Sequence, residues 1–434
     1  MSGGPTAFLA ELAWRGLLYQ RTAEAELDVH LGAPGRLGYC GFDPTADSLT
    51  IGNLVPLMML AHWQRAGHAP LAVIGGGTGL IGDPSERDAE RPLLSREQVE
   101  ANVAGQRRIF ERLLDFDARR PNAAKLLDNA AWLCRLGYVE VLREVGKHFS
   151  VNAMIAREAV RARLEDREHG ISYTEFSYAI LQAYDFLHLH RELGCSVQMA
   201  GSDQYGNIVS GIDLIHRSLG PRAEAYGVTA PLVTRSDGKK FSKSEGRAVW
   251  LTADRTSPYA FYQHWLNVPD TDAARFLRIY SLLSAQEIAD LAAKQEAAPH
   301  ERPAQRALAR ELTERLHGEG ERRRVQHASE AVFGAGELRG LDAATLAEVV
   351  AELPRSVEPR AALAGEGVAL ADLLPRTSLA ASKREAREFL RAGAVHLNGA
   401  RAGEDARVRS SDLLEGGTLL LRRGKKLWHA VVWE

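Results

Sequence analysis

The sequence is poor in cysteine and has no long apolar run. Its three cysteines, Cys40, Cys134 and Cys195, lie far apart and form no C-x-x-C pair. This spacing argues against a zinc ribbon and against a disulfide framework. No apolar run reaches the roughly 18 residues of a membrane span, and the first residues lack the basic and apolar stretches of a secretory signal. We therefore expect a cytoplasmic protein without a membrane span and without a dedicated metal site.

Neither composition nor net charge is extreme for the chain as a whole. Apolar residues make up 45% and charged residues 25% of its length, which are ordinary values for a globular protein. A chain of 434 residues is expected to form two or three domains. The net charge of −2 is unevenly distributed, because the segment from Arg376 to Glu434 carries 12 Lys and Arg against 7 Asp and Glu. This basic end suggests an anionic macromolecular partner, although a solvated surface would have the same composition.

Strand and helix signals alternate over the first 250 residues. Short apolar runs at 38–42, 70–74, 196–200 and 231–233 indicate buried strands, and residues 123–136 could hold another. Helices are expected at 8–31, 95–114, 139–165, 173–190 and 207–219, and Ser95 with Gln98 is spaced as a capping box. This alternation predicts a Rossmann-like α/β domain with a parallel sheet between two helical layers. Its ligand site should lie at the carboxyl ends of the strands.

The pattern changes after about residue 250. Ala-, Glu- and Arg-rich helix signals follow one another from Ser257, and mixed structure returns near Val368. In that last part, Ser382 marks a helix start, Asn398-Gly399 a turn, and Gly424 a closing pair of strands. We expect a Rossmann-like α/β domain over 1–250, a helical domain over 251–353, a linker over 354–367 and a small α+β domain over 368–434.

Three segments carry the features of a phosphate site. Residues 38–60 pass from a strand through a Gly/Pro/Thr/Asp turn into a helix, which brings unpaired N–H groups and a helix N-terminus together. Residues 77–82 match G-x-G-x-x-G, but a polar segment follows where dinucleotide binding requires an apolar helix, so a ligand loop is favoured over NAD binding. Residues 236–244 place three lysines after a glycine turn. We favour binding of a polyphosphate leaving group by these lysines over the alternative, an exposed basic loop without a ligand.

These segments resemble a known family. Residues 240–244, KFSKS, resemble the KMSKS signature of class I aminoacyl-tRNA synthetases, and residues 50–53, TIGN, occupy the place of the HIGH signature. Four further segments resemble the bacterial tyrosyl-tRNA synthetases in particular: YCGFDPT at 39–45, GLIGDPS at 79–85, YAILQAYD at 178–185 and GSDQ at 201–204. The similarity extends over the whole chain and includes an S4-like tail. It implies activation of tyrosine by ATP, through tyrosyl-adenylate, and transfer to tRNA(Tyr).

The resemblance implies a role for each matching residue. The phenolic hydroxyl of tyrosine would be bound by Tyr39 and Asp185. The α-ammonium group would be held by Asp83, Tyr178 and Gln182, and the carboxylate by Gln204. The ATP-binding residues would be Cys40, Gly41, Asp43, Gly52, Gly201, Asp203, Lys240 and Lys243. The catalytic residues around the phosphates would be Thr45, Thr50, Asn53, Arg87, Arg91, Lys240 and Lys243. Tyr178 and Gln182 lie four residues apart on one expected helix, so they could instead face the core.

Thr50 is a departure from the family pattern, because the first position of the signature is His in the family. A threonine hydroxyl replaces an imidazole, and the loss of one donor to a developing phosphate charge costs on the order of 2–4 kcal/mol. Two alternatives to a standard tyrosine–tRNA ligase therefore stay open. One is a slow or specialised paralogue that activates tyrosine or an analogue, and the other is a catalytically silent RNA-binding protein.

The resemblance also implies partners. ATP would be the co-substrate, with Mg²⁺ carried by ATP and not by a dedicated protein site. The RNA-contacting face of the S4-like domain would include Lys383, Arg384 and Arg387, although these could be solvated cations on a helix. The family works as a symmetric homodimer, which in this chain would form through residues 131–165.

Overall fold

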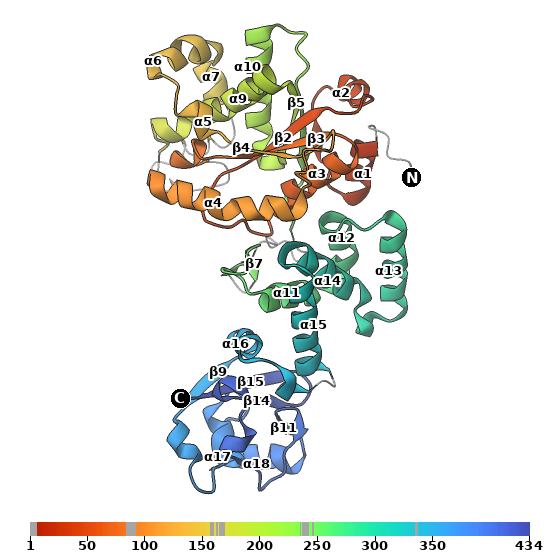
Figure 1. Ribbon diagram of the computed structural model, residues 1–434, viewed down its shortest axis with the longest axis vertical. Helices are drawn as coiled ribbons and strands as arrows, with labels where there is room; N and C mark the ends of the chain where they lie inside the picture. The colour runs from red at the N-terminus through yellow and green to blue at the C-terminus, as the bar shows by residue number, and fades with distance from the viewer. Residues whose placement is uncertain are drawn as a thin grey trace. The chain divides into compact units, whose positions relative to one another are not determined.

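The computed structural model describes residues 7–83, 93–156, 160–161, 164, 170–234, 236, 243–244, 247–334 and 337–434. The chain divides into two compact units (Figure 1). The first consists of Met1–Arg255 and Val268–Leu308, and the second of Thr256–Asn267 and Ala309–Glu434. Among the described residues, no helix combines the length and the apolarity that crossing a membrane requires.

A six-stranded sheet lies at the centre of the first unit, in the order β1-β6-β5-β2-β3-β4. Its strands are parallel except β1, which pairs antiparallel with β6 at one edge. Strand β3 is buried along its whole length, as expected for a parallel strand covered on both faces. The chain order reverses between β2 and β5, which is where such sheets bind ligands. The strands are β1 Gln20–Arg21, β2 Leu37–Phe42, β3 Ala69–Ile74, β4 Lys125–Asp128, β5 Cys195–Gly201 and β6 Tyr226–Ala230.

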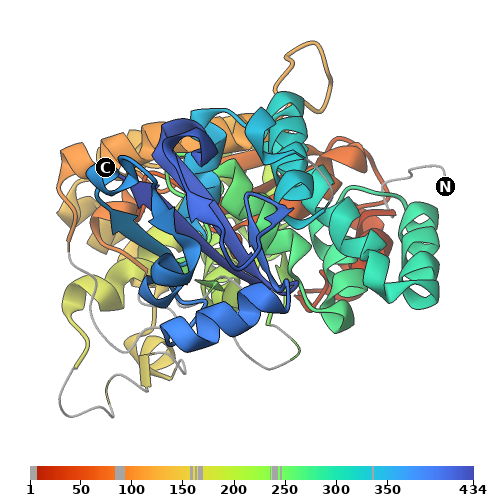
Figure 2. The same cartoon turned by 90° about the horizontal axis from the view of Figure 1, so that it is seen from below.

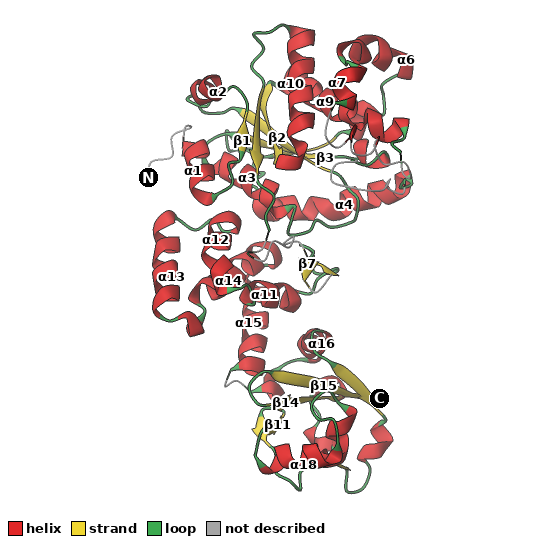
Figure 3. Cartoon of the chain, turned by 180° about the vertical axis from the view of Figure 1, so that it is seen from behind, coloured by secondary structure: helices red, strands yellow, loops and turns green. Residues whose placement is uncertain are grey.

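Helices cover both faces of this sheet, as the alternating pattern predicted. Helices α3 and α4 lie on one face, and α9 and α10 lie on the other (Figures 1 and 3). The predicted capping box at the start of α4 is confirmed, because the Ser95 and Gln98 side chains each accept the other residue's backbone N–H. The helices are α1 Ala7–Arg15, α2 Glu24–His30, α3 Leu54–Arg65, α4 Arg96–Leu113, α5 Ala130–Leu133, α9 Tyr173–Leu193 and α10 Tyr205–Leu219.

Three element predictions for this unit need correction. The helix expected over 8–31 is two helices, because Gly16 takes a left-handed φ of 75° after α1 and β1 then joins the sheet edge. The strand expected at 231–233 lies earlier, as β6, and ends before Pro231, which has no N–H for the ladder. The helical segment expected over 139–165 is broken into short pieces as far as it is described: α6 Tyr138–Glu140, η2 Val141–Val145, η3 Gly146–His148 and α7 Val151–Ile155.

Residues 268–308 belong to the first unit and residues 309–353 to the second, so the expected helical domain over 251–353 is divided. The buried Arg15 side chain of α1 explains this attachment. Its guanidinium donates to carbonyl oxygens at and beyond the end of α12, those of Arg278 at 2.8 Å, Ser281 at 2.7 Å and Leu283 at 2.7 Å. A cation suits the carbonyl end of a helix. The two helices held in this way are α12 Asp270–Tyr280 and α13 Ala285–Ala297.

The second unit combines helices with a five-stranded sheet, in the order β12-β11-β14-β15-β9. Strand β9 pairs in parallel with β15. The expected linker over 354–367 therefore contains a strand of the sheet, because its extended backbone completes the ladder beside β15. The helices are α11 Pro258–Leu266, α14 Pro303–His317 (which begins in the first unit), α15 Glu319–Phe333 and α16 Ala343–Ala351. The strands are β9 Arg355–Glu358, β11 Val395–Leu397, β12 Ala400–Arg401, β14 Thr418–Arg423 and β15 Leu427–Trp433.

The local signals in the tail are confirmed. Ser382 caps α18 by accepting the Glu385 N–H at 3.2 Å. Asn398 and Gly399 form the turn between β11 and β12 with φ values of 46° and 89°. Leucines of β14 face a core shared with α17 and α18, and α18 lies along one face of the blue strands (Figures 1 and 2). The remaining elements are β10 Val368–Ala369, α17 Leu370–Leu373, α18 Lys383–Arg391 and β13 Arg407–Val408.

Candidate active site

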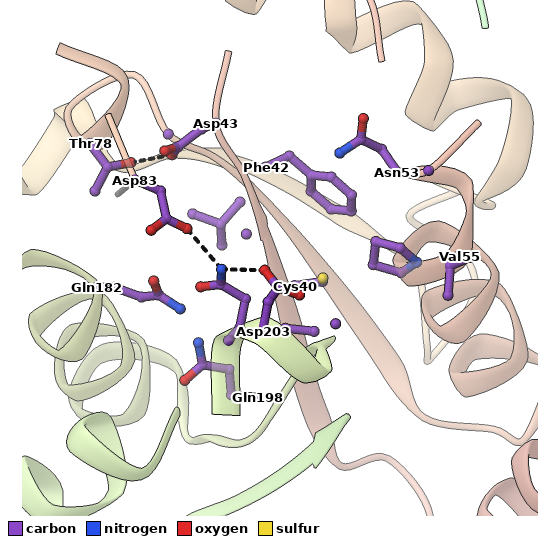
Figure 4. A pocket seen from close by; sticks show the side chains of 18 of the residues that line it. Cys40, Phe42, Asp43, Asn53, Val55, Thr78, Asp83, Gln182, Gln198 and Asp203 are labelled. Carbon is purple, nitrogen blue, oxygen red and sulfur yellow. Dashed lines mark hydrogen bonds between the residues drawn. The ribbon is translucent and has the colours of Figure 1, made fainter. Parts of the chain in front are cut away.

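A pocket of about 440 Å³ opens at the carboxyl ends of β2 and β5 (Figure 4). It lies at the reversal point of the sheet, where the strand pattern predicted a ligand site. Fourteen of the residues assigned through the resemblance line it: Tyr39, Cys40, Gly41, Asp43, Thr45, Gly52, Asn53, Asp83, Tyr178, Gln182, Asp185, Gly201, Asp203 and Gln204. Segments as far apart in the sequence as 39–45 and 201–204 therefore meet in one cavity.

Tyr39 and Asp185 are two buried polar residues that line the pocket. Tyr39, on β2, is only 2% exposed, and its hydroxyl has no hydrogen-bond partner within the described residues. Burial raises the pKa of this phenol well above its ordinary value, and the nearby Asp185 carboxylate raises it further. Phe186 holds the Tyr39 ring at a centroid distance of 5.4 Å. Burying a hydroxyl without a hydrogen-bond partner costs free energy of folding. The Tyr39 hydroxyl is therefore available to bind a polar group of a ligand.

The Asp185 carboxylate, by contrast, is held by two donors. It accepts from Asn129 Nδ2 at 2.9 Å and from Trp132 Nε1 at 2.6 Å. Burial raises the pKa of Asp185 to about 7, against the lowering effect of these two bonds. Sequence reasoning missed both donors. Asn129 follows directly after β4, so the only available signal was a polar residue at the carboxyl end of a strand.

Asp43 connects the glycine-rich turn after β3 to α9. Its Oδ1 accepts from Thr78 Oγ1 at 2.7 Å, and its Oδ2 accepts from the Tyr178 hydroxyl at 2.9 Å. The turn approaches closely, because a Cβ on Gly75 would lie 2.3 Å from Asp43 Oδ1. Tyr178 therefore faces the pocket and not the helical core. The turn continues as a single 3-10 turn, η1 Thr78–Leu80, and not as the helix of a dinucleotide fold.

Side-chain amides join the opposite wall of the pocket. Gln204 Nε2 donates to Asp83 at 2.8 Å and to Asp203 at 2.7 Å (Figure 4). Asn207, another residue that sequence reasoning missed, donates to Gln182 at 3.1 Å and to Gln204 at 3.0 Å. These bonds orient the groups that the resemblance assigns to the ammonium and carboxylate of an amino acid.

The charge of the lining is negative. Four carboxylates line the cavity, those of Asp43, Asp83, Asp185 and Asp203, and the described lining includes no Lys or Arg. Within the described part of the chain, no group of His, Cys, Asp and Glu could hold a metal ion. Arg87, Arg91, Lys240 and the side chain of Lys243 lie outside the described residues; the backbone of Lys243 belongs to the two-residue strand β7 Lys243–Ser244.

Thr50 does not line the pocket, although Gly52 and Asn53 do. Its backbone N–H and its hydroxyl both donate to Asn53 Oδ1, each at 3.0 Å. It also forms a β-bridge with Trp250. Thr50 is therefore engaged with the protein at the edge of the site.

Comparison with known proteins agrees with this geometry. Residues 37–334 match the family model described as tRNA synthetases class I (W and Y), and residues 350–431 match the tyrosine–tRNA ligase SYY-like C-terminal domain. The chain is 47% identical to the tyrosine–tRNA ligase of Roseiflexus castenholzii over 427 residues, 98% of this chain and 99% of the relative. It is 48% identical to that of Opitutus terrae over 424 residues, with the same coverage. The chain belongs to the tyrosine–tRNA ligase family.

A solved member of this family supports the fold. The C-terminally truncated mitochondrial tyrosyl-tRNA synthetase of Coccidioides posadasii superimposes with a TM-score of 0.66 at 31% identity, covering 73% of this chain and 90% of that chain. The predicted α/β fold class, class I synthetase family and enzyme class are thus confirmed. The match of the C-terminal domain begins at residue 350, before β9, which agrees with β9 belonging to that domain.

The proposed RNA-binding residues of this tyrosine–tRNA ligase lie on α18. Lys383 is paired with Asp372, and Arg384 with Glu388 at 3.2 Å. Arg387 is exposed and makes no ion pair among the described residues. The turn between β14 and β15 adds two further exposed cations, Lys425 and Lys426, which sequence reasoning had counted as charge but not singled out.

Proposed function

We propose that this pocket binds L-tyrosine with its phenol between Tyr39 and Asp185 and activates it with ATP, before transfer to tRNA(Tyr). Tyrosine–tRNA ligation is the activity of the family, and the assignment of individual residues is our proposal. The observation that carries it is the buried Tyr39 hydroxyl, which has no protein partner among the described residues and lies beside a buried carboxylate. A phenol can accept from the first group and donate to the second, whereas phenylalanine would leave both without a ligand partner.

The rest of the amino acid would follow the polar walls of the pocket. Asp83, Tyr178 and Gln182 would hold the α-ammonium group, and the negative lining favours a cation at this position. Gln204 would contact the carboxylate. Cys40, Gly201 and Asp203 would contact the ribose of ATP, with Asp43 and Gly41 close to the α-phosphate.

The chemical step would need no general base, because the attacking carboxylate is already ionised. One carboxylate oxygen forms a bond to the α-phosphorus, the bond from that phosphorus to the bridging oxygen breaks, and pyrophosphate leaves with the electron pair. The barrier is then lowered by alignment and by positive groups around the leaving phosphates. We assign the positive charge to Arg87, Arg91, Lys240 and Lys243, with Mg²⁺ bound to ATP. Thr45 would help to align the phosphates through a neutral hydrogen bond from its hydroxyl. In the second step a ribose hydroxyl of tRNA attacks the carbonyl carbon and AMP leaves.

Tyrosine-dependent exchange of pyrophosphate into ATP tests this proposal. We expect exchange with tyrosine and little with phenylalanine. A silent RNA-binding protein would show no exchange above background, and an enzyme for a tyrosine analogue would prefer that analogue. Replacement of Asp185 by Ala should abolish the preference for tyrosine, because the phenol then loses its acceptor. The measurement thus separates the three functions that the sequence left open.

We further propose that the enzyme is a cytoplasmic homodimer that associates through the segment 138–155. Large apolar side chains are exposed on its short helical pieces, including Tyr138 at 64%, Val139 at 75% and Val151 at 58%. Such a concentration of apolar surface is typical of an interface. Val139→Glu should shift the mass in sedimentation from dimer to monomer, whereas Val29→Glu, at an exposed valine of α2 outside this segment, should leave the mass unchanged. Equal masses for wild type and Val139→Glu would exclude this surface.

A further inference from the structure

Thr50 is fixed at the edge of the pocket by backbone pairing on both sides. The Ile51 N–H donates to the Val249 carbonyl at 3.0 Å, and the Leu251 N–H donates to the Leu49 carbonyl at 2.8 Å. These bonds flank the β-bridge between Thr50 and Trp250. The backbone of Thr50 is therefore fixed, and its hydroxyl is held by the bond to Asn53. Thr50 lies outside the residues that line the cavity, so direct contact with a ligand is not what this geometry favours.

The side chain of Asn53 is the partner of Thr50. Asn53 stands at the N-cap position of α3, where an asparagine usually accepts from a backbone N–H two or three residues later. Here it makes no such bond, and the third residue of the helix is Pro56, which has no N–H. The Asn53 Oδ1 atom accepts instead from both donors of Thr50.

This double contact decides which way the Asn53 amide points. A backbone N–H can only donate, so the atom that faces the Thr50 N–H must be the amide oxygen. The Asn53 Nδ2 group then faces away from Thr50. It makes no hydrogen bond within the described residues, and in Figure 4 the amide extends from the start of α3 toward the pocket. A donor is thus presented to the cavity at the mouth next to Gly52.

We propose that Thr50 is a positioning residue that locks the Asn53 amide so that its N–H₂ group donates to an oxygen atom of the bound nucleotide. This inference rests on the proposed function of the pocket. Asn53 is the group that touches ATP, and Thr50 acts through it. An imidazole at position 50 is then unnecessary for orienting Asn53, because a backbone N–H and a hydroxyl provide two donors to one oxygen.

A double-mutant cycle in the full-length enzyme tests the coupling, with pyrophosphate exchange as the readout. Thr50→Val removes the hydroxyl but keeps the shape and the backbone bond. It should lower kcat/KM for ATP about three- to tenfold, the range expected for one hydrogen bond, with the KM for tyrosine unchanged. Thr50→Ser should recover most of this loss, because both donors are retained. In an Asn53→Ala background, Thr50→Val should have no further effect.

The variant Asn53→Asp separates two properties of Asn53: its position, which the bonds from Thr50 hold, and the hydrogen bond that its N–H₂ group donates to the nucleotide. Aspartate still accepts both bonds from Thr50 but offers no N–H and turns a negative charge toward the nucleotide, so activity should fall at least as far as in Asn53→Ala. Thr252→Val is the matched control. It removes a buried hydroxyl that bonds Ser48 at 2.9 Å in the same paired segment, outside the pocket lining. It should lower thermal stability about as much as Thr50→Val without changing the KM for ATP.

If the wild-type enzyme is active, three results would overturn the proposal. The first is an equal loss from Thr50→Val in the wild-type and Asn53→Ala backgrounds, because Thr50 would then act independently of Asn53. The second is an Asn53→Asp enzyme with normal ATP kinetics. The third is a Thr252→Val enzyme with the same kinetic defect as Thr50→Val, which would indicate a structural effect. A wild-type chain without tyrosine-dependent exchange would overturn the proposed function together with this inference, whereas an active enzyme with an additive cycle would overturn only the role of Thr50.

Discussion

The hydroxyl of Tyr39 is a buried donor and acceptor that has no hydrogen-bond partner among the described residues. Removing it in Tyr39→Phe should raise the KM for tyrosine about two- to tenfold, because one neutral hydrogen bond contributes about 0.5–1.5 kcal/mol. The preference for tyrosine over phenylalanine should narrow by a similar factor, since phenylalanine makes no use of this hydroxyl. Exchange kinetics with each amino acid measure both quantities. Tyr259→Phe, at a buried tyrosine outside the pocket lining, is the control. An unchanged ratio for Tyr39→Phe would contradict a phenol site here.

The Asp185 carboxyl should make tyrosine binding depend on pH. Burial raises its pKa to about 7. Above this pH the group is ionised and accepts a strong bond from the phenol, whereas below it the carboxyl is protonated and accepts more weakly. The KM for tyrosine should therefore fall as the pH rises through about 7, and the KM for ATP should follow a different profile. Kinetics on either side of this pH check the prediction. A flat profile for tyrosine would mean that the two donors, Asn129 and Trp132, keep the carboxylate ionised throughout.

The sequence could assign site roles only to residues within the segments that resemble the family. Tyr39 and Asp185 belong to segments that resemble the family, and the structure brings them into one cavity. Asn129 and Trp132, which hold Asp185, lie more than 50 positions before it and belong to no quoted segment. Their role depends on where β4 ends relative to α9, and this is a property of tertiary packing that local patterns do not contain.

At the scale of elements, Arg15 joins α1 to the end of α12 through three carbonyl oxygens. Arg15→Lys should lower the free energy of unfolding by at least about 2 kcal/mol, because one ammonium cannot reach all three and each bond to a charged donor is worth about 1.5–3 kcal/mol. The midpoint of thermal unfolding measures this loss. Arg21→Lys, at a surface arginine paired with Glu24 and Asp28, should change stability by less than about 0.5 kcal/mol. Similar losses in both variants would show that the carbonyl contacts contribute little.

Helix α12 shows why some of the fold could be predicted from the sequence and some could not. The alternation of apolar runs and helix signals was enough for the parallel sheet, because period and length are local properties. The helical region expected from Ser257 onward also includes α12. The assignment of α12 to the first unit follows from a bond that spans 263 residues, from Arg15 to Arg278, which no helix signal contains. Strand β9 was missed for a similar reason, since the strand with which it pairs, β15, lies far along the chain.

At the scale of the whole molecule, two activities should be separable: adenylate formation in the pocket of the first unit, and recognition of tRNA with the help of the basic tail. The relevant cations are Arg387 on α18 and Lys425 and Lys426 on the turn after β14. All three are exposed, and the described residues give them no ion-pair partner. Each phosphate that a cation neutralises contributes to affinity in a salt-dependent way.

We therefore expect Lys425→Glu and Arg387→Glu to reduce tRNA charging while pyrophosphate exchange stays at the wild-type rate. The slope of tRNA affinity against salt should fall by about one for each phosphate that is no longer neutralised. Lys294→Glu on α13 carries the same charge change at an exposed site of the first unit and should leave both activities unaltered. A truncation that tests the whole domain has to begin before β9, because cutting at residue 368 would leave β9 without its partner β15. Parallel loss of exchange and charging in the point variants would mean that the tail supports the fold of the catalytic unit and does not contact RNA.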